Sequence, residues 1–462
     1  MKTAAVILAA GQGVRMKSDR AKVLHEVCGK SLLAHVLEAV RTLNPDPLVV
    51  VVGHGADEVK AEFKDEKVTW IEQKERRGTG HALAQAEGAL KGFTGRLFVL
   101  CGDAPLVRPE TLVALTRAAE GRLATVLTCE VEDASGYGRI IRSSKGDVTR
   151  IVEHRDATEE EREIREINSG GYAFEAPAVF DAVRQLKPAN SQGEYYLTDV
   201  LPILMKKGRI GACVAEDPAE VLGVNSRRDL ALATSRMRDR ILRHHMDAGV
   251  TIVAPDLTFI ECGVEIGADT VIEPFTVIRS GVKIGSHCEV GPFCQLRAGA
   301  VLDDHAEVGN FVEMKKSRLG SHSKAKHLSY LGDATIGARV NIGAGTITAN
   351  YDGVNKHPTV IEDGASTGSH TVLVAPSTMK KGSKTGAGAV VTKKTMAEGE
   401  TWVGVPARPL ARAKRPERGP EGPESKGKPA RPPSSNPDKP LTRPPARNTL
   451  IAPVSKKRSP RA

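Results

Sequence analysis

Residues 260–314 read "IECGVEIGADTVIEPFTVIRSGVKIGSHCEVGPFCQLRAGAVLDDHAEVGNFVEM" and repeat every six residues. An aliphatic residue or methionine occupies each sixth position without a gap, although such side chains make up about a quarter to a third of an average sequence. The residue two positions earlier is usually Thr, Cys, Ala or Val, which explains Cys288 and Cys294 as packing residues. Such hexads predict a left-handed parallel β-helix whose coils stack inward aliphatic side chains into a column. The ten positions are Ile260, Ile266, Ile272, Ile278, Ile284, Val290, Leu296, Leu302, Val308 and Met314.

The N-terminal part of the chain alternates apolar runs with segments of helical spacing. Residues 3–10 (TAAVILAA) are continuously apolar, and 31–43 have helical periodicity. The apolar runs at 47–54 and 95–103 are each followed by a segment of helical spacing. The segment that follows the second run covers residues 109–121. This rhythm predicts a parallel, Rossmann-like α/β sheet whose ligands bind at the carboxyl ends of its strands.

Length and composition support a multidomain chain. At 462 residues and 40% hydrophobic content, the chain exceeds what one core usually serves. We predict an α/β domain over 1–226, a linker helix over 227–249, a β-helix over 250–410 and a tail over 411–462. The linker carries His244 and His245, which are expected to be solvated rather than metal ligands because no third ligand lies at a suitable spacing.

The net charge of +10 resides in the tail. Residues 411–462 hold 14 Lys and Arg against 4 Asp and Glu, together with 12 of the 27 prolines, so the rest of the chain is neutral. With almost no aliphatic clusters the tail cannot bury enough surface to offset ordering, and we expect it to be disordered. A solvated extension is the favoured interpretation, and weak binding to nucleic acid or anionic membrane lipid is the minority alternative.

Cysteine usage and hydropathy indicate the compartment. Seven cysteines form an odd set without a CxxC pair, which favours reduced thiols over a disulfide framework or a zinc site. No run of 18 apolar residues occurs, and the N-terminal apolar run is broken by glycine too early for a signal peptide. A soluble, cytoplasmic protein is expected.

A glycine turn with two cations follows the first apolar run. Gly11, Gly13, Arg15 and Lys22 match neither the Walker loop nor the dinucleotide fingerprint. The backbone N–H groups of such a turn can approach a phosphate that Arg15 and Lys22 neutralise. The alternative is a glycine-rich surface turn before a cationic helix start, and the two cations in one loop favour the phosphate site.

Several motifs give the chain a resemblance to a known family. "LAAGQGVRM" with "KVL" resembles the signature of the sugar-nucleotide pyrophosphorylases, and further motifs extend the match colinearly over about residues 3 to 395. These motifs are EQKERRGTGHAL (72–83), LCGDAPL (100–106), GYGRI (136–140), IVEH (151–154), NSGGY (168–172), QGEYYLTD (192–199) and GVNSR (223–227). Together they resemble the bacterial bifunctional N-acetylglucosamine-1-phosphate uridylyltransferases/glucosamine-1-phosphate acetyltransferases. The resemblance implies an enzyme that makes UDP-N-acetylglucosamine for the cell envelope.

The resemblance implies a uridylyl-transfer site in the α/β domain. Transfer of UMP from UTP is an in-line displacement, which needs positioning and charge neutralisation more than a base. Arg15 and Lys22 would act on the phosphates, and Asp103 and Asn225 would hold Mg²⁺, although either could alone be a turn-forming Asx cap. The implied nucleotide-binding residues are Leu8, Ala9, Ala10, Gly11, Gly13, Lys22, Gln73, Gly78 and Thr79. The implied sugar-phosphate residues are Gly138, Glu153, Asn168 and Asn225.

The segment 312–356 interrupts the hexad rhythm and clusters Lys, His, Tyr and Asn, a poor composition for a stacked core. It resembles the acetyltransferase site of the same family, which implies that His327 is the general base for attack of the glucosamine amine on acetyl-CoA. The implied sugar-phosphate residues are Arg297, Lys315, Tyr330, Asn341 and Lys356. The implied acetyl-CoA residues are Ala344, Asn350, Tyr351, Ser369, Ala387 and Arg408. The family's coenzyme sites lie between β-helices, which implies a homotrimer.

The chain departs from the family pattern at a few places. Cys101 stands where a tyrosine is frequent, and Thr367 and Lys384-Thr385 stand where inward aliphatics are expected. The arginine expected for the coenzyme phosphate falls near Val405, so Arg408 is the nearest candidate. Two alternatives stay open: a single-activity pyrophosphorylase whose β-helix serves oligomerisation, and a non-catalytic regulatory subunit, which the intact Arg15, Lys22, Asp103 and Asn225 argue against.

Overall fold

The first apolar run forms an inner strand of a nine-stranded sheet, β1 (Thr3–Ala9). It pairs in parallel with β4 (Leu48–Val52) and β6 (Arg96–Cys101), so these strands end at one edge of the sheet. The computed structural model describes residues 2–144, 146–190 and 192–410, and the predicted tail lies outside them. The sheet and the repeat region described below confirm the predicted fold class.

The strands of the sheet do not all run in one direction. β10 (Glu166–Glu175) pairs antiparallel with β6 and with β7 (Ala124–Glu130), and its register shifts between Asn168 and Gly171. The all-parallel sheet expected from the sequence is therefore a mixed sheet. Its strand order is β11-β7-β10-β6-β1-β4-β5, with β8 attached antiparallel to β10 and β9 antiparallel to β8. The remaining strands are β5 (Thr69–Glu72), β8 (Arg139–Arg142), β9 (Val148–Val152) and β11 (Ile210–Val214).

Both faces of the sheet are buried. Ala5 and Ile7 of β1 pack into one apolar cluster, while Ala4 and Val6 pack into a second one on the opposite face, as the alternation of side chains along a strand requires. The helices are α1 (Leu32–Arg41), α2 (Ala56–Glu62), α3 (Thr79–Gln85), α4 (Pro109–Ala118), α5 (Glu159–Arg162), α6 (Ala176–Val183) and α7 (Val200–Met205). A short hairpin of β2 (Glu26–Val27) and β3 (Lys30–Ser31) precedes α1.

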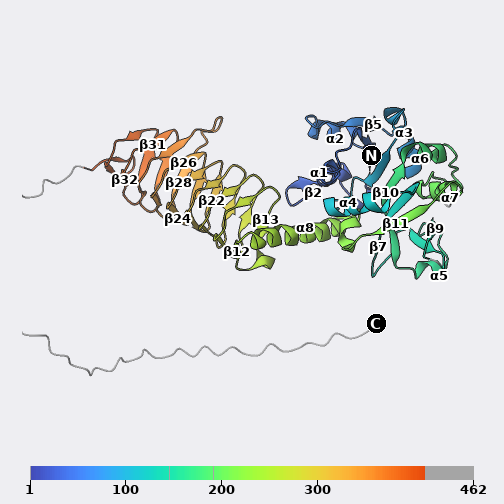
Figure 1. Ribbon diagram of the computed structural model, residues 1–462. Coiled ribbons are helices and arrows are strands. Elements are labelled where there is room, and N and C mark those ends of the chain that lie inside the picture. The colour runs from blue at the N-terminus through green and yellow to red at the C-terminus, as the bar shows by residue number, and fades with distance from the viewer. Residues whose placement is uncertain (1, 145, 191, 411–462) are drawn as a thin grey trace, which may run out of the picture. The chain divides into compact units, whose positions relative to one another are not determined.

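A long helix, α8 (Arg227–Asp247), separates the sheet from the repeat region in the chain (Figure 1). It begins with a capping box, in which Ser226 and Asp229 satisfy each other's backbone N–H groups. The expectation that both histidines of this helix are solvated is wrong for His245. His245 is 5% exposed, and burial lowers its pKa, whereas His244 is exposed.

The hexads form a parallel β-helix with three sheets. Ile260, Ile278 and Leu296 stand in register on one sheet, so a coil takes 18 residues, or three hexads. The first sheet holds β12 (Thr251–Ile252), β15 (Val271–Ile272), β18 (Glu289–Val290), β21 (Glu307–Asn310), β24 (Lys324–His327) and β27 (Asn341–Ile342). The second holds β13 (Phe259–Ile260), β16 (Val277–Ile278), β19 (Gln295–Leu296), β22 (Glu313–Lys315), β25 (Tyr330–Gly332), β28 (Ile347–Ala349), β30 (Val372–Val374) and β33 (Val390–Thr392).

The third sheet covers the remaining face, and a small sheet closes the coils. The third sheet holds β14 (Glu265–Ile266), β17 (Lys283–Ile284), β20 (Val301–Leu302), β23 (Arg318–Leu319), β26 (Ala334–Ile336), β29 (Thr359–Ile361), β31 (Ser377–Met379) and β34 (Thr395–Met396). The small sheet holds β32 (Lys384–Thr385), β35 (Thr401–Val403) and β36 (Arg408–Pro409).

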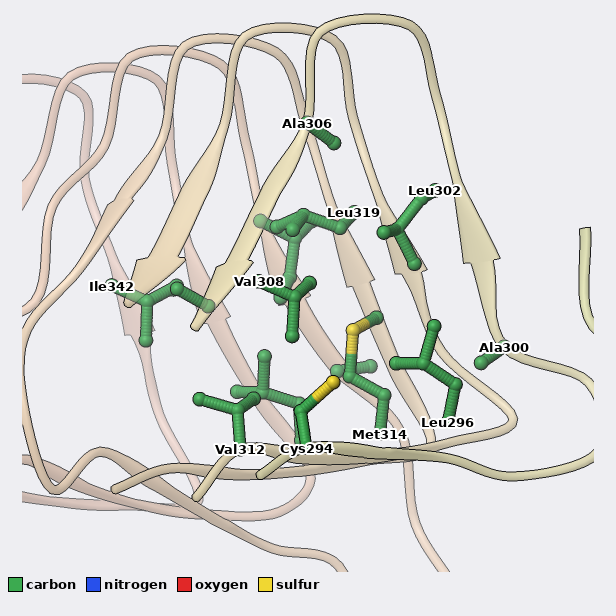
Figure 2. Close-up of a cluster of buried hydrophobic side chains, with 14 of the residues drawn as sticks. Cys294, Leu296, Ala300, Leu302, Ala306, Val308, Val312, Met314, Leu319 and Ile342 are labelled. Carbon is green, nitrogen blue, oxygen red and sulfur yellow. The ribbon is translucent and has the colours of Figure 1, made fainter. Parts of the chain in front are cut away.

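The predicted aliphatic column lies inside the coils. Figure 2 shows Leu296, Leu302, Val308 and Met314 pointing into the enclosed space, with Cys294 among them. The interrupted segment continues this stack, because Leu302 pairs with Leu319, one residue short of a full coil. The hexad rhythm is therefore displaced by one residue while the coils stay stacked.

The later coils replace part of the apolar column with hydroxyl groups. Thr367 and Thr385 are buried at 4% and 6% exposure, where inward aliphatics were expected. Their hydroxyl oxygens lie 2.8 Å from those of Thr346 and Thr371, respectively. Buried hydroxyls cost little when paired, so the departure is accommodated inside the coil.

All seven cysteines are free thiols. Among the described residues, no helix is long and apolar enough to cross a bilayer.

Candidate active sites

The glycine loop after β1 is shaped around one lysine side chain. A Cβ on Gly13, whose φ is +66°, would lie 2.7 Å from Lys22 Cβ, and a Cβ on Gly11 would lie 3.8 Å from Lys22 Nζ. Lys22 itself begins a short 3₁₀ turn, Lys22–Leu24. The glycines thus let the lysine lie across the turn, with its ammonium at the strand ends.

The ammonium of Lys22 meets two oxygens from distant parts of the chain. It forms an ion pair with Asp103, two residues after β6, and donates to Asn225 Oδ1 at 3.2 Å, just before α8. The side chains of Lys22 and Asp103 are 11% and 18% exposed. The structure therefore brings together three of the predicted site residues.

Asp103 and Asn225 are held by backbone contacts and by a helix cap. The N–H of Val224 donates to Asp103 O at 2.8 Å, and Asn225 N donates to the carboxylate of Asp229 in the capping box at 2.9 Å. Asn225 Nδ2 donates to Gly223 O at 3.3 Å, which leaves Asn225 Oδ1 facing Lys22. The geometry is set by the start of α8 as much as by the sheet.

These two oxygens fit a divalent cation of the magnesium type. A carboxylate and an amide oxygen are hard ligands, and a positive charge, the Lys22 ammonium, already lies against both of them. Mg²⁺ commonly takes only one or two carboxylates from the protein and completes its shell with water and substrate phosphate. Within the described ranges, no cluster of three or more His, Cys, Asp or Glu side chains could hold a metal ion.

A cavity of about 660 Å³ lies at these strand ends. Its volume is within the range of small-ligand sites. Ten predicted residues line it: Leu8, Ala9, Ala10, Gly11, Lys22, Gln73, Gly78, Thr79, Asp103 and Glu153. Cys101 lines it as well; its thiol donates to Gly170 O at 3.6 Å, and burial raises its pKa to about 12, so this thiol packs rather than reacts.

One side of the cavity is made by the start of α3 and a neighbouring loop. Gly78 has φ +100°, and a Cβ there would lie 2.6 Å from Tyr195 O, so only glycine fits this approach. Thr79 Oγ1 accepts from Leu197 N at 3.0 Å, and Gln73 Nε2 donates to Gly78 O at 3.1 Å. Two of the predicted nucleotide-binding residues, Gln73 and Gly78, are thus joined by a hydrogen bond.

Glu153 lines another side of the cavity, near two residues that were predicted to bind the sugar phosphate. Asn168 N donates to Gly138 O at 2.8 Å, and a Cβ on Gly138 would lie 3.4 Å from both Glu153 oxygens. Burial raises the pKa of Glu153, partly offset by the Thr198 hydroxyl, which donates to it at 3.4 Å. Gly138 and Asn168 are adjacent to the cavity-lining carboxylate without lining the cavity themselves.

Several residues that line the cavity were not among the predicted site residues, and the predicted Arg15 and Gly13 do not line it. Gln12, Arg76, Gln192, Glu194 and Tyr196 line the cavity, and Gln192 donates to Tyr196 Oη at 2.7 Å. The motifs that contain them were recognised, but no role was given to these positions. Arg15 is exposed on a 3₁₀ turn, Val14–Met16, and neither it nor Gly13 lines the cavity.

A second group of predicted residues lies on the β-helix. Lys315 is the last residue of β22, which pairs with β25, and β25 begins at Tyr330. The neighbouring ammonium of Lys356 lowers the pKa of Lys315, and the charge of Arg297 lowers it further by a smaller amount. Arg297 also donates to Glu313 at 2.6 Å. Cations this close repel one another unless an anion lies among them, which makes the cluster a candidate phosphate site.

His327 lies on the adjacent sheet, at the end of β24, in register with Asn310. It is exposed, and its imidazole makes no hydrogen bond within the described ranges. Asn341 of β27, which was also predicted, pairs with Lys324 of β24, the strand that carries His327. His327 and Tyr330 therefore lie on either side of one corner of the β-helix.

The predicted coenzyme residues follow one another on successive coils. Ala344 O accepts from His370 N at 2.6 Å, and Ser369 O accepts from Gly388 N at 2.8 Å, so Ala344, Ser369 and Ala387 lie on neighbouring coils of one corner. Asn350 donates to Asp333, while Tyr351 is 59% exposed. Arg408, on β36, is exposed and donates to Ala407 O at 3.0 Å, with no ion pair among residues 2–410 that the structure describes.

Comparison with known proteins assigns the α/β domain and the β-helix each to a class of protein. Residues 5–198 match the MobA-like NTP transferase domain, and residues 263–298 match the bacterial transferase hexapeptide of six repeats. The chain thus joins a nucleotidyltransferase domain to a hexapeptide-repeat transferase region.

Whole-length relatives make the assignment specific. "Bifunctional protein GlmU" of Pelotomaculum thermopropionicum is 46% identical over 412 residues, which cover 81% of this chain and 90% of that protein. The proteins of the same name from Halalkalibacterium halodurans and Geobacillus sp. are 43% and 45% identical, covering 84% and 85% of this chain and 93% of each relative. The chain belongs to the family of bifunctional GlmU proteins.

Proposed function

We propose that this bifunctional enzyme acetylates glucosamine 1-phosphate with acetyl-CoA and then transfers UMP from UTP to the product, giving UDP-N-acetylglucosamine and diphosphate. The observation that carries the uridylyl step is the meeting of Lys22, Asp103 and Asn225 at a cavity of about 660 Å³. Family membership over most of the chain supports both activities.

In the uridylyl step, a phosphate oxygen of N-acetylglucosamine 1-phosphate attacks the α-phosphorus of UTP, and diphosphate leaves. Lys22 lies where it can neutralise the triphosphate, and Arg15 on the exposed turn would act as a second cation. Asp103 and Asn225 would hold Mg²⁺, which when bound neutralises phosphate charge. Glu153 and its neighbours Gly138 and Asn168 would bind the sugar.

In the acetyl step, His327 would accept a proton from the glucosamine amine as the nitrogen attacks the thioester carbonyl of acetyl-CoA. The amide C–N bond forms, the C–S bond breaks, and coenzyme A leaves as its thiol. Arg297, Lys315 and Lys356 would bind the phosphate of the sugar, because their mutual repulsion is relieved by an anion. Tyr330 and Asn341 would orient the amine.

Oligomerisation agrees with the hexapeptide repeat, and we infer a homotrimer through the β-helix. Ala344, Asn350, Tyr351, Ser369, Ala387 and Arg408 would then take acetyl-CoA between copies. Because UTP and acetyl-CoA are cytoplasmic metabolites, we place both reactions in the cytoplasm.

The test is a coupled assay with glucosamine 1-phosphate, acetyl-CoA, UTP and Mg²⁺, in which thiol and diphosphate release are followed separately. Omission of acetyl-CoA should stop diphosphate release, and N-acetylglucosamine 1-phosphate should restore it. Diphosphate release without any acetyl-CoA-dependent thiol would instead identify a single-activity pyrophosphorylase.

A further inference from the structure

A loop leaves the β-helix between β28 and β29 and turns back on itself. Tyr351 and Lys356 pair as an antiparallel bridge, and His357 N donates to Asn350 O at 2.8 Å, so residues 350–357 form a hairpin (the Lys356 hairpin). Every residue between Asn350 and His357 is exposed. Because so little of this hairpin is buried, its shape depends mainly on its own hydrogen bonds.

The carboxylate of Asp352 joins the two halves of the Lys356 hairpin. Its Oδ1 accepts from the backbone N–H groups of Val354 at 2.9 Å and Asn355 at 2.7 Å. Its Oδ2 lies 2.6 Å from Nε2 of His357. The hydrogen bond from Asn355, followed by those from His357 and Val354, holds the pKa of Asp352 well below its usual range. Asp352 is therefore charged at neutral pH and fixed at both oxygens.

The Lys356 hairpin starts at the corner of the β-helix that carries the cationic cluster. Arg297 N donates to Met314 O at 2.8 Å, so Arg297 and Lys315 lie on neighbouring coils of this corner. Asp333 N donates to Lys315 O at 3.0 Å, and Asn350 donates to the carboxylate of Asp333. The base of the hairpin is thereby tied to the coil that follows Lys315.

The ammonium groups of Lys356 and Lys315 are close enough for Lys356 to lower the pKa of Lys315. Among the described residues, neither of these lysines forms an ion pair with a carboxylate. Like charges at this spacing repel, so the two ammonium groups do not hold each other in place. The backbone of the exposed Lys356 must be held by the hairpin, and the carboxylate of Asp352 is the group that joins the hairpin's two halves.

We propose that Asp352 is a positioning residue that, through the Lys356 hairpin, holds Lys356 beside Lys315 to receive the phosphate of the aminosugar substrate. The proposal rests on the proposed acetyl transfer to glucosamine 1-phosphate. Asp352 acts without touching the substrate, since both of its oxygens are engaged within the hairpin. Cations that are placed before the phosphate arrives leave less ordering to be done on binding, which raises affinity.

The test compares Asp352→Ala and Asp352→Asn with the parent enzyme in acetyl transfer. Alanine removes every contact of the carboxylate, so the KM for glucosamine 1-phosphate should rise by about ten-fold while kcat stays within about three-fold. Asparagine keeps an oxygen for the N–H groups of Val354 and Asn355, so the KM should stay within about three-fold of the parent's. Asp363→Ala is the matched control, because exposed Asp363 accepts from Ala338 N at 2.8 Å beyond the other end of β29. This control should leave the KM unchanged.

A double variant shows whether Asp352 acts through Lys356. Lys356→Ala should raise the KM for glucosamine 1-phosphate by about ten-fold, and adding Asp352→Ala should raise it by less than about two-fold more. Additive effects in the double variant, or an Asp352→Asn variant as impaired as Asp352→Ala, would overturn the proposal. So would a fall in kcat at unchanged KM, which is the result expected if Asp352 only helps the protein to fold.

Failure of the proposed function has a different signature. If the parent protein releases no thiol from acetyl-CoA with glucosamine 1-phosphate, the acetyl-transfer assignment fails. Calorimetric Kd values for glucosamine 1-phosphate and amide hydrogen exchange of residues 353–357 then test the hairpin. Asp352→Ala should raise the Kd and the exchange rates by about ten-fold, and Asp352→Asn should preserve both. Faster exchange with an unchanged Kd would refute the role of Asp352 in phosphate binding, and no binding by the parent would refute both proposals.

Discussion

The ammonium of Lys22 lies 3.2 Å from the amide oxygen of Asn225, although 203 residues separate them in the chain. Asp103 completes the contact from a third segment. One loop after β1, one strand end and one helix start thus share a single charged centre. We expect this centre and the cationic cluster on the β-helix to work independently.

Asp103→Asn removes the carboxylate charge at the strand ends while keeping its shape. Uridylyl transfer should fall by roughly 100-fold or more, because charge neutralisation is the main contribution at such a site, and acetyl transfer should be retained. His327→Ala should do the reverse, losing about 100-fold or more in acetyl transfer. Separate assays of diphosphate and thiol release check this. Loss of both activities in either folded variant would contradict two independent sites.

Glu153→Gln should stabilise the fold near neutral pH while weakening sugar-phosphate binding. Burial raises the pKa of Glu153 in the folded state, so the folded protein binds a proton more tightly than the unfolded chain. The free energy of unfolding therefore falls as pH rises from the ordinary glutamate range through the raised pKa. The gain in Tm of the glutamine variant should be present at pH 7.5 and absent near pH 3.5. A pH-independent difference would rule out this titration as its cause.

Arg227→Ala should loosen the loop that carries Lys22. Arg227 Nε donates to Met16 O at 3.2 Å, and Nη1 donates to His25 Nδ1 at 3.3 Å, so the first residue of α8 contacts both sides of that loop. Loss of these contacts should lower kcat/KM for UTP by about ten-fold. Arg228→Ala is the matched control, since Arg228 makes no such contact among the described residues. An equal effect of both changes would point to overall charge instead.

Arg408→Ala tests the coenzyme end of the β-helix. A charge-assisted contact with phosphate contributes roughly 1.5–3 kcal/mol, so the KM for acetyl-CoA should rise by about ten-fold or more while uridylyl transfer stays unchanged. Saturation curves for acetyl-CoA check this. Overlapping curves would show that the phosphate is held elsewhere, with Lys384, Lys393 and Lys394 as the next candidates.

The column of buried aliphatic side chains in the β-helix could be predicted because burial there depends only on a residue's position within its hexad. Ile260 and Met314 obey the same rule although nine hexads separate them, and the coils bury both. The antiparallel course of β10 could not be predicted in this way, since its partners β6 and β7 lie far back in the chain. His245 was misjudged because a helical pattern alone does not say which neighbour covers a given face.

The residues of the candidate sites could be predicted mainly from sequence motifs. Lys22, Asp103 and Asn225 were selected by resemblance, and their contact depends on three strand and helix ends that no local pattern brings together. The contact between Gln73 and His81 was not predicted, because it depends on where α3 begins relative to the end of the sheet. Arg15 shows the reverse case, since its motif is clear but it does not line the cavity.

The 18-residue coil has a consequence for how this protein can change in length. Adding or removing one whole coil leaves every later side chain on its own face, whereas most other length changes would turn aliphatic residues outward. The 17-residue step from Leu302 to Leu319 shows that the stack also absorbs the loss of one corner residue. The β-helix can therefore grow or shrink in whole-coil units by duplication or excision, while the positions around His327 keep their faces.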